Sequence, residues 1–208
     1  MDPGTFHVRV EERVLCAQSV DLLKETDRVC GYYIVQGTFL FEGEILEKDT
    51  FLWFTAGDTC EVKTVGQPVV IFIGSTTKRA AGKTVYQRFD ERKIPWSRPL
   101  TDGMTASRHM IRAEDWGVKI QTCIYTKGFH HERHSHSAAH GFYVLEGLLY
   151  WQTGGGEAQI FGPGEFAVSG TDIEMLHEVA DGCPYCRYLF IGDGPFDFIV
   201  NGVDIYGA

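Results

Sequence analysis

The sequence contains no apolar run long enough to cross a lipid bilayer. Its first residues carry charges where a secretory signal needs an apolar core: they read MDPGTFHVRVEERVL. Basic residues are also in the minority, because 19 Lys and Arg stand against 28 Asp and Glu, which gives a formal net charge of −9. This balance argues against nucleic acid or an anionic membrane as the main partner. We therefore expect a cytoplasmic protein.

The sequence also lacks a disulfide framework. Its six cysteines are scattered, and in a cytoplasmic chain of this size we expect them to be reduced. Cys183-Pro-Tyr-Cys186 has the CxxC spacing of redox and zinc sites. A redox CxxC needs a helix N-terminus to lower the thiol pKa, and this one lies between two strand-like runs. We interpret it as a hairpin turn, with a redox or zinc role as the alternative.

What the sequence does contain favours β-structure. Twenty-four glycines, 14 Phe, 9 Tyr and 4 Trp are typical of an all-β protein with many tight turns. A repeat is also present: Gly31-Tyr-Tyr-Ile-Val-Gln-Gly37 matches Gly141-Phe-Tyr-Val-Leu-Glu-Gly147, and Ile71-Phe-Ile-Gly74 matches Leu189-Phe-Ile-Gly192. Short apolar runs broken by Gly, Asp and Asn predict antiparallel hairpins in both copies.

The expected strands can be placed from these runs. In the first copy they cover residues 6–15, 31–35, 37–46, 50–54, 60–65 and 69–73, and in the second copy they include 122–125, 142–145 and 148–152. Gly154-Gly155-Gly156 is expected to form a hairpin tip, and residues 198–205 a final hairpin around an Asn-Gly turn.

Histidines gather between Gly128 and Gly147. His134 and His136 stand two apart, and a β-strand sends such residues to the same face, so their imidazoles can share one metal ion. His140 follows just before an apolar run, and a chain that turns back there adds a third imidazole. The alternative interpretation is a histidine-rich surface loop.

This stretch resembles the first motif of the cupin superfamily, a family of small metal-binding β-barrels. In that motif a glycine, a His-x-His pair, a glutamate and a second glycine follow at fixed spacings. Gly128, His134, His136 and Gly147 match it, and His140 occupies the place of the glutamate.

The family's second motif resembles the segment that begins at Gly164-Glu165. Gly170 replaces its proline, Asp172 replaces its second glycine, and His177 stands slightly later than the motif's histidine. Both changes fall in the turn of an expected hairpin, where insertions are tolerated. The resemblance thus implies a fourth ligand at His177.

Together with the repeat, the resemblance covers nearly the whole sequence. It implies an all-β fold of two tandem cupin barrels, of the double-stranded β-helix or jelly-roll type. We place a degenerate barrel at residues 1–88, a linker at 89–104 and a metal-binding barrel at 105–208.

Only the second barrel is expected to bind metal. In the first copy Lys24, Thr26 and Cys30 occupy the ligand positions, and Thr59 or Cys60 stands where the second motif has histidine. In the second copy the implied ligands are His134, His136, His140 and His177. Neutral imidazoles suit Fe, Zn or Ni, with Mn or Cu as further options, and suit Mg or Ca poorly.

Other polar residues are candidates for roles around the ion. His130 has the strand parity of His134, so it is a candidate catalytic group together with Glu174 and Tyr150. The commoner interpretation of His130 and His131 is that both are exposed loop residues. In the linker, Trp96 and Arg98 either line the mouth of a pocket or serve an interface between barrels.

For function, the resemblance implies a metal-dependent enzyme acting on a small organic substrate with a carbonyl, enol or phenol oxygen. A non-haem iron dioxygenase is the first hypothesis. A Zn- or Ni-dependent cyclase or isomerase of the aromatic polyketide type, or a non-catalytic small-ligand-binding or regulatory cupin, is the alternative. We expect a small-molecule substrate, no nucleic-acid or membrane partner, and a homodimer.

Overall fold

The structure is a computed structural model that describes residues 6–16, 20–22, 28–55, 61–79, 86–194, 199–200 and 203–204. Over this part of the chain strands predominate, as predicted. The chain divides into two compact units, His7–Ile94 and one that contains Pro95–Ala208, here called the N-terminal and C-terminal units. Among the described residues, no helix has the length and apolar character that crossing a membrane requires.

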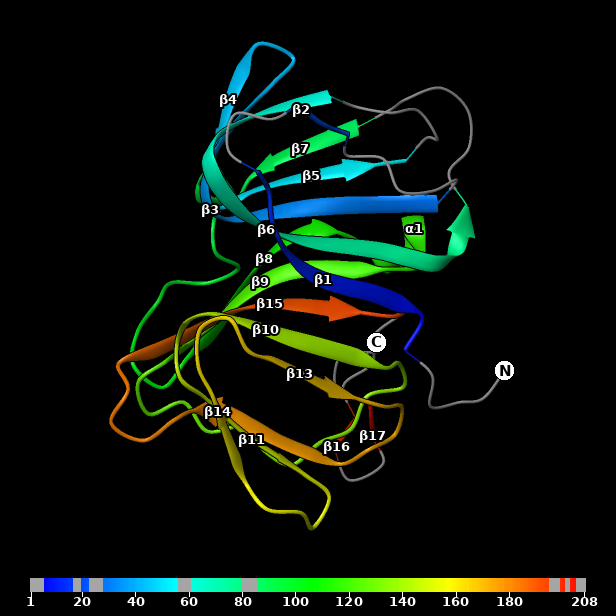
Figure 1. Ribbon diagram of the computed structural model, residues 1–208. Coiled ribbons are helices and arrows are strands. Elements are labelled where there is room, and N and C mark those ends of the chain that lie inside the picture. Colours follow the sequence, from blue (N-terminus) through cyan, green and yellow to red (C-terminus); the bar gives the residue numbers. More distant parts are fainter. Residues whose placement is uncertain are drawn as a thin grey trace. The chain divides into compact units, whose positions relative to one another are not determined.

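The N-terminal unit is built around two long strands, β3 and β6. In the described residues its sheet runs β1-β6-β3-β5-β7, with β2 also paired to β6 and β4 to β3 (Figure 1). Its elements are β1 (Val8–Val14), β2 (Val20–Leu22), β3 (Arg28–Phe41), β4 (Glu44–Glu47), β5 (Thr50–Phe54), β6 (Glu61–Arg79), β7 (Tyr86–Asp90) and the 3-10 helix η1 (Glu91–Lys93).

Two of the predicted strand boundaries in this unit are wrong. The runs 60–65 and 69–73 join into β6, because the residues around Gly66 form a bulge opposite Gln36 and Gly37 rather than a turn. The run 37–46 instead breaks at Glu42 and Gly43, which both have positive φ and form the turn between β3 and β4. The strand predicted at 50–54 is confirmed.

The C-terminal unit contains a larger sheet, β13-β10-β15-β9-β8, a smaller one, β12-β11-β14, and the hairpin β16-β17 within its described residues (Figure 1). Its elements are β8 (Thr105–Ile111), α1 (Ala113–Trp116), β9 (Lys119–Thr126), β10 (His140–Gly147), β11 (Leu149–Thr153), β12 (Gln159–Phe161), β13 (Phe166–Ser169), β14 (Met175–Val179), β15 (Tyr185–Gly192), β16 (Ile199–Val200) and β17 (Val203–Asp204). The last two strands pair as predicted, although the Asn-Gly turn between them lies outside the described residues.

The sequence repeat is also a repeat of strand pairing. β1 pairs with β6, β6 with β3 and β3 with β5, just as β9 pairs with β15, β15 with β10 and β10 with β13. The registers agree as well, since Gly31 lies opposite Ile73 and Gly141 lies opposite Ile191. In each unit an aromatic ring covers the strand glycine, Phe51 over Gly31 and Phe166 over Gly141.

The interior of the C-terminal unit is aromatic. Along β10, Phe142 and Val144 face one core cluster with Trp151 of β11 and Tyr188 of β15. The rings of Phe142 and Trp151 meet edge to face with their centroids 4.8 Å apart. This cluster forms the floor against which the histidines pack.

Cys183 lies in the turn-rich connection that follows β14, and Cys186 lies in β15 itself. β14 and β15 belong to different sheets, so the predicted hairpin turn is wrong. Both cysteines are free, and Cys186 is fully buried. Burial, and then the nearby Cys183, raises the pKa of the Cys186 thiol. A redox CxxC requires a lowered thiol pKa, so the raised pKa of Cys186 does not favour a redox role.

The ring that covers Gly141 gives a direct test of this packing. A Cβ at Gly141 would lie 2.3 Å from Cζ of Phe166. We expect Gly141→Ala to lower the free energy of unfolding by about 1–3 kcal/mol, the usual cost of overpacking. Thermal unfolding measures the effect, and adding Phe166→Leu should restore most of the loss. Gly155→Ala is the control, because a Cβ there meets nothing within 4 Å. Equal melting temperatures for the two alanine variants would refute the packing.

Candidate metal centre

Five imidazoles converge inside the C-terminal unit. His134, His136, His140 and His177 are buried, with 1%, 1%, 0% and 3% of their surface exposed, and His131 is half-buried. They come from the loop after β9, from the first residue of β10 and from β14. The ring centroids of His134 and His177 are 4.7 Å apart, and those of His136 and His140 are 4.6 Å apart.

His134 and His136 reach the interior by the alternation that the sequence predicts. The backbone of His134 exchanges two hydrogen bonds with Met175, and the backbone of Ser135 bridges to Ile199. These bridges hold the short segment extended, so Ser135 is more exposed while both histidines point inward.

His177 enters from β14, directly opposite Trp151 of β11, and the two rings stack 5.6 Å apart. The turn before His177 explains how the altered second motif still brings this histidine into the site. Asp172 has a φ of 55°, the left-handed conformation that favours glycine, and its N–H donates to the carbonyl oxygen of His136. Asp172 therefore does occupy a glycine-like position, and this turn ties the two histidine-bearing segments together.

His130 is an exposed loop residue, as the commoner interpretation predicts, whereas that interpretation is wrong for His131. His131 is not an exposed loop residue: its ring lies 4.4 Å from that of His134 and 4.9 Å from that of His177. His130 is exposed and its Nδ1 lies 2.9 Å from a carboxylate oxygen of Glu178. The alternative that strand parity turns His130 toward His134 is wrong, because residues 129–133 form an irregular loop without strand alternation.

Two of the buried imidazoles have their tautomer set by the backbone. Nδ1 of His134 lies 2.7 Å from the carbonyl oxygen of Glu132, and Nδ1 of His140 lies 3.1 Å from that of Ala138. A carbonyl oxygen only accepts, so each Nδ1 carries the proton and donates it. The Nε2 atom of each ring is then left with its lone pair, as a metal ligand requires.

His177 is held by a side chain instead. Its Nδ1 lies 2.5 Å from the hydroxyl of Tyr125, and its Nε2 lies 3.0 Å from Nε2 of His134. Two nitrogens bound to one ion at about 2.1 Å and at a right angle are also about 3.0 Å apart. This spacing therefore fits two neighbouring ligands of one metal ion.

The lowered pKa values of these histidines also favour the binding of a cation. Burial lowers the pKa of His134 and lowers that of His140 to about 4. Burial, and then repulsion from His134 when that ring is protonated, lower the pKa of His131 to about 3. For His177, burial and then the neighbouring imidazoles hold the pKa well below its usual value. At neutral pH these rings are uncharged and their lone pairs are available.

The ring nitrogens of His131, His134 and His177 that could bind a metal all lie within 4.8 Å of one another. The structure therefore contains a group of three histidines able to hold a metal ion, with His136 and His140 beside it. Only nitrogen donors are present in this group, and such donors suit Fe, Zn or Ni.

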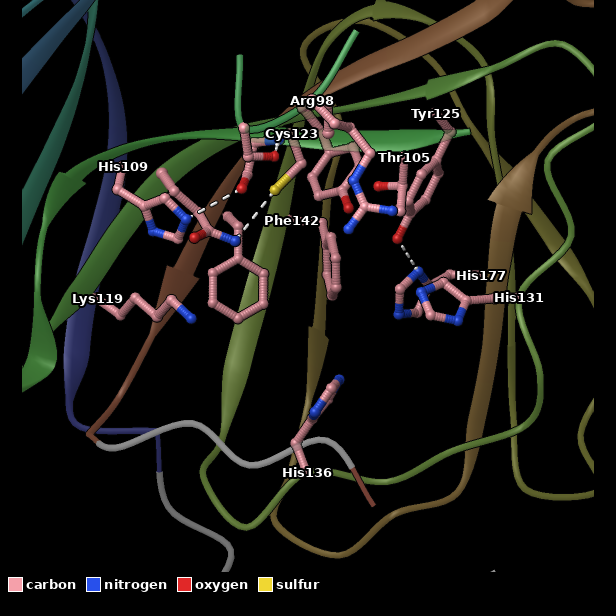
Figure 2. A pocket seen from close by; sticks show the side chains of 16 residues that line it. Arg98, Thr105, His109, Lys119, Cys123, Tyr125, His131, His136, Phe142 and His177 are labelled. Atoms are coloured by element: carbon pink, nitrogen blue, oxygen red, sulfur yellow. Dashed lines mark hydrogen bonds between the residues drawn. The ribbon is translucent and has the colours of Figure 1, made fainter. Parts of the chain in front are cut away.

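A cavity of about 380 Å³ opens onto three of these histidines, His131, His136 and His177. Figure 2 shows His131 and His177 on one side, His136 below, and Lys119 and His109 on the opposite side of Phe142. The described lining residues are Ser97, Arg98, Thr105, Ala106, Ser107, His109, Lys119, Gln121, Cys123, Tyr125, His131, His136, Phe142, His177, Tyr188 and Phe190. A volume of this size suits a small organic molecule.

The other sequence candidates lie around this cavity rather than in it, except Arg98, which lines it. Glu174 is exposed, 4.0 Å from Arg133, and Tyr150 lies on the face of β11 opposite to Trp151. The ring of Trp96 packs under the guanidinium of Arg108 at 4.0 Å. Sequence reasoning missed the contribution of β9, whose only signal was the alternation of Lys119, Gln121, Cys123 and Tyr125.

No protein-family model and no curated protein sequence matches the chain. Solved structures do. A cupin 2 conserved barrel domain protein from Leptotrichia buccalis has a TM-score of 0.67 at 16% identity, covering 90% of this chain and 84% of that one. Protein Ylba from E. coli has a TM-score of 0.64 at 12% identity, with coverages of 93% and 85%. A mutant of Bacillus subtilis oxalate decarboxylase has a TM-score of 0.68 at 8% identity, with coverages of 94% and 71%. The chain therefore has a cupin fold.

The backbone-fixed tautomers distinguish between the candidate ligands. We expect His134→Ala, His140→Ala and His177→Ala to lose bound metal, because a hydrogen bond anchors Nδ1 of each ring and leaves Nε2 as its ligand atom. His131→Ala should keep most of it. His140→Glu should also keep it, since a carboxylate there restores the commoner cupin motif. Elemental analysis after dialysis measures the content, with His130→Ala as the exposed control. Loss of metal from His131→Ala with retention in His140→Ala would overturn this choice.

Proposed function

We propose that the C-terminal unit is a metal-dependent enzyme that acts on a small organic molecule through a carbonyl, enol or phenol oxygen. The observation that carries this proposal is the 3.0 Å approach of Nε2 of His134 to Nε2 of His177 at the end of a cavity. We assign the ligands as His134, His136, His140 and His177. An ion held by side chains beside an open cavity is typical of catalytic rather than structural metal sites.

A transition-metal ion bound there would supply Lewis-acid or one-electron chemistry to the substrate oxygen. The chain supplies orientation and proton control. When Nε2 of His177 is a ligand, the ring proton must lie on Nδ1, from which it is donated to the hydroxyl oxygen of Tyr125. Tyr125 thereby keeps the His177 ring in place, as groups hydrogen-bonded to ligands commonly do. Phe142, Tyr188 and Phe190 add aromatic surface to the cavity lining.

We further propose that the two units are tandem cupin barrels, of which the first has lost its site. Cys30 lies opposite Gly74 just as His140 lies opposite Gly192. The register of β6 also places Val62 opposite Phe41, as His177 is placed opposite Trp151. Val62, rather than Thr59 or Cys60, is therefore the counterpart of His177.

Both Cys30 and Val62 belong to a buried apolar cluster. The sequence-derived counterparts Lys24, Thr26, Thr59 and Cys60 lie outside the described residues. An apolar core at these places supports a structural role for the first barrel.

For the reaction we propose oxygen chemistry of the non-haem iron dioxygenase type. Nitrogen donors suit Fe(II). A second candidate is a metal-assisted isomerase or cyclase, which one observation favours: the ligands are neutral. Without a carboxylate ligand, the ion keeps its full 2+ charge and polarises a bound oxygen more strongly.

Metal exchange tests the reaction type. Metal-free protein reconstituted with Fe(II) or with Zn(II) is mixed with a panel of diketones and phenols, while dioxygen uptake and substrate loss are recorded. We expect uptake and turnover with Fe(II) only, because Zn(II) has no redox chemistry. His134→Ala is the control that separates bound from free iron. Turnover with Zn(II) and no uptake would instead show an isomerase or cyclase. Tight binding without turnover by either form would show a ligand-binding protein.

A further inference from the structure

Strand β9 carries a row of four polar side chains along one face of the cavity. Lys119, Gln121, Cys123 and Tyr125 alternate with residues of the opposite face, and all four line the cavity. The row leads from the ammonium of Lys119 to the hydroxyl of Tyr125, which contacts His177. A molecule in the cavity therefore meets polar groups in a fixed order.

The far end of this row is positively charged. Lys119 is half-buried and its Nζ lies 5.9 Å from the centroid of Phe190, whose ring also stacks on His140 at 5.6 Å. A second cation, Arg98, is exposed at the mouth, and Figure 2 shows it beside Thr105 rather than beside Lys119. Among the lining residues that the structure describes there is no Asp or Glu, although the chain has a net charge of −9. The local charge of the cavity is thus opposite to that of the whole chain.

Gln121, the second member of the row, has an unsatisfied buried atom. Its side chain is 8% exposed and its Nε2 donates to Sγ of Cys123 at 3.2 Å. Its Oε1 is buried without a hydrogen-bond partner. An unpaired buried acceptor is costly, so a donor on a bound molecule would stabilise the folded state. Oε1 of Gln121 is therefore a candidate acceptor for a hydrogen-bond donor of a ligand in the middle of the cavity.

The sequence repeat gives Lys119 a counterpart in the N-terminal unit. Arg9 of β1 lies opposite Gly74 and over the ring of Phe72 at 5.7 Å, as Lys119 lies opposite Gly192 and over Phe190.

The neighbouring position differs between the units. In the N-terminal unit it is Glu11, whose carboxylate forms an ion pair with Arg9 at 2.5 Å, and in the C-terminal unit it is Gln121. The C-terminal unit therefore has an amide where its counterpart has a carboxylate that binds the equivalent cation.

We propose that the cavity takes a small organic carboxylate that also carries a hydrogen-bond donor such as a hydroxyl or enol. Its carboxylate lies at Lys119, with Arg98 at the mouth, its donor faces Oε1 of Gln121, and its other end faces His177 and His131. The placement of that other end rests on the proposed function. The carboxylate subsite does not depend on it, because Lys119 and Gln121 are not metal ligands.

Matched probes test the subsite. Benzoate and benzamide have the same shape and differ in charge, and calorimetric titration gives the affinity of each for metal-free and for metal-loaded protein. We expect benzoate to bind at least about tenfold more tightly than benzamide, because a charge-assisted hydrogen bond is about twice as strong as a neutral one. Lys119→Met should lower the affinity for benzoate roughly tenfold and leave that for benzamide unchanged.

Gln121→Glu recreates the arrangement of the N-terminal unit. It should weaken benzoate binding at least as much as Lys119→Met does, because its carboxylate repels the probe and binds the lysine. Lys127→Met, at an exposed lysine outside the cavity, is the control and should bind benzoate as the unmodified protein does.

The metal content of each variant is measured in parallel. Failure of benzoate to bind, equal affinity for benzamide, or unchanged binding by Lys119→Met would each overturn the carboxylate subsite. A protein that prefers benzoate but retains no transition metal would overturn the proposed function alone. The two failures are therefore distinguishable.

Discussion

Four imidazoles in the C-terminal unit are removed from water, and burial lowers the pKa of those at His134, His140 and His177 so that they remain uncharged. A buried ring nitrogen is costly unless it meets a donor, an acceptor or an ion. Two backbone carbonyls and the Tyr125 hydroxyl satisfy Nδ1 of these three rings. Nε2 of His134 and Nε2 of His177 then lie 3.0 Å apart, an approach that one shared cation would satisfy. The surrounding strands and the turn at Asp172 hold the histidine-bearing segments together.

Most of the histidine cluster could be predicted from the sequence, because the i, i+2 alternation of His134 and His136 requires only a short extended segment. His177 could be found despite the altered motif, since Asp172 adopts the glycine conformation that the motif needs. His131 could not, because its position depends on an irregular loop without a periodic signal. Along β9 the alternation was visible, but which face of the strand meets a cavity depends on long-range pairing with β8 and β15.

The two units show how one topology supports two outcomes. Strand pairing, the ring-covered glycines and the cation over an aromatic ring are common to both. Cys30 and Val62 make the interior apolar in the first unit, whereas His140 and His177 make it polar in the second. Few substitutions in an unchanged frame thus separate a packed core from a candidate catalytic centre, which agrees with the rule that function resides in sites rather than in folds.

We propose that the protein holds one transition-metal ion and that the C-terminal unit alone binds it. Elemental analysis of the purified chain, after growth in metal-rich medium and dialysis, tests it most directly. We expect about one transition-metal ion per chain. Two ions per chain would contradict the assignment of an apolar core to the N-terminal unit. No bound ion would contradict the metal centre itself, because the converging Nε2 atoms would then be satisfied only by one another.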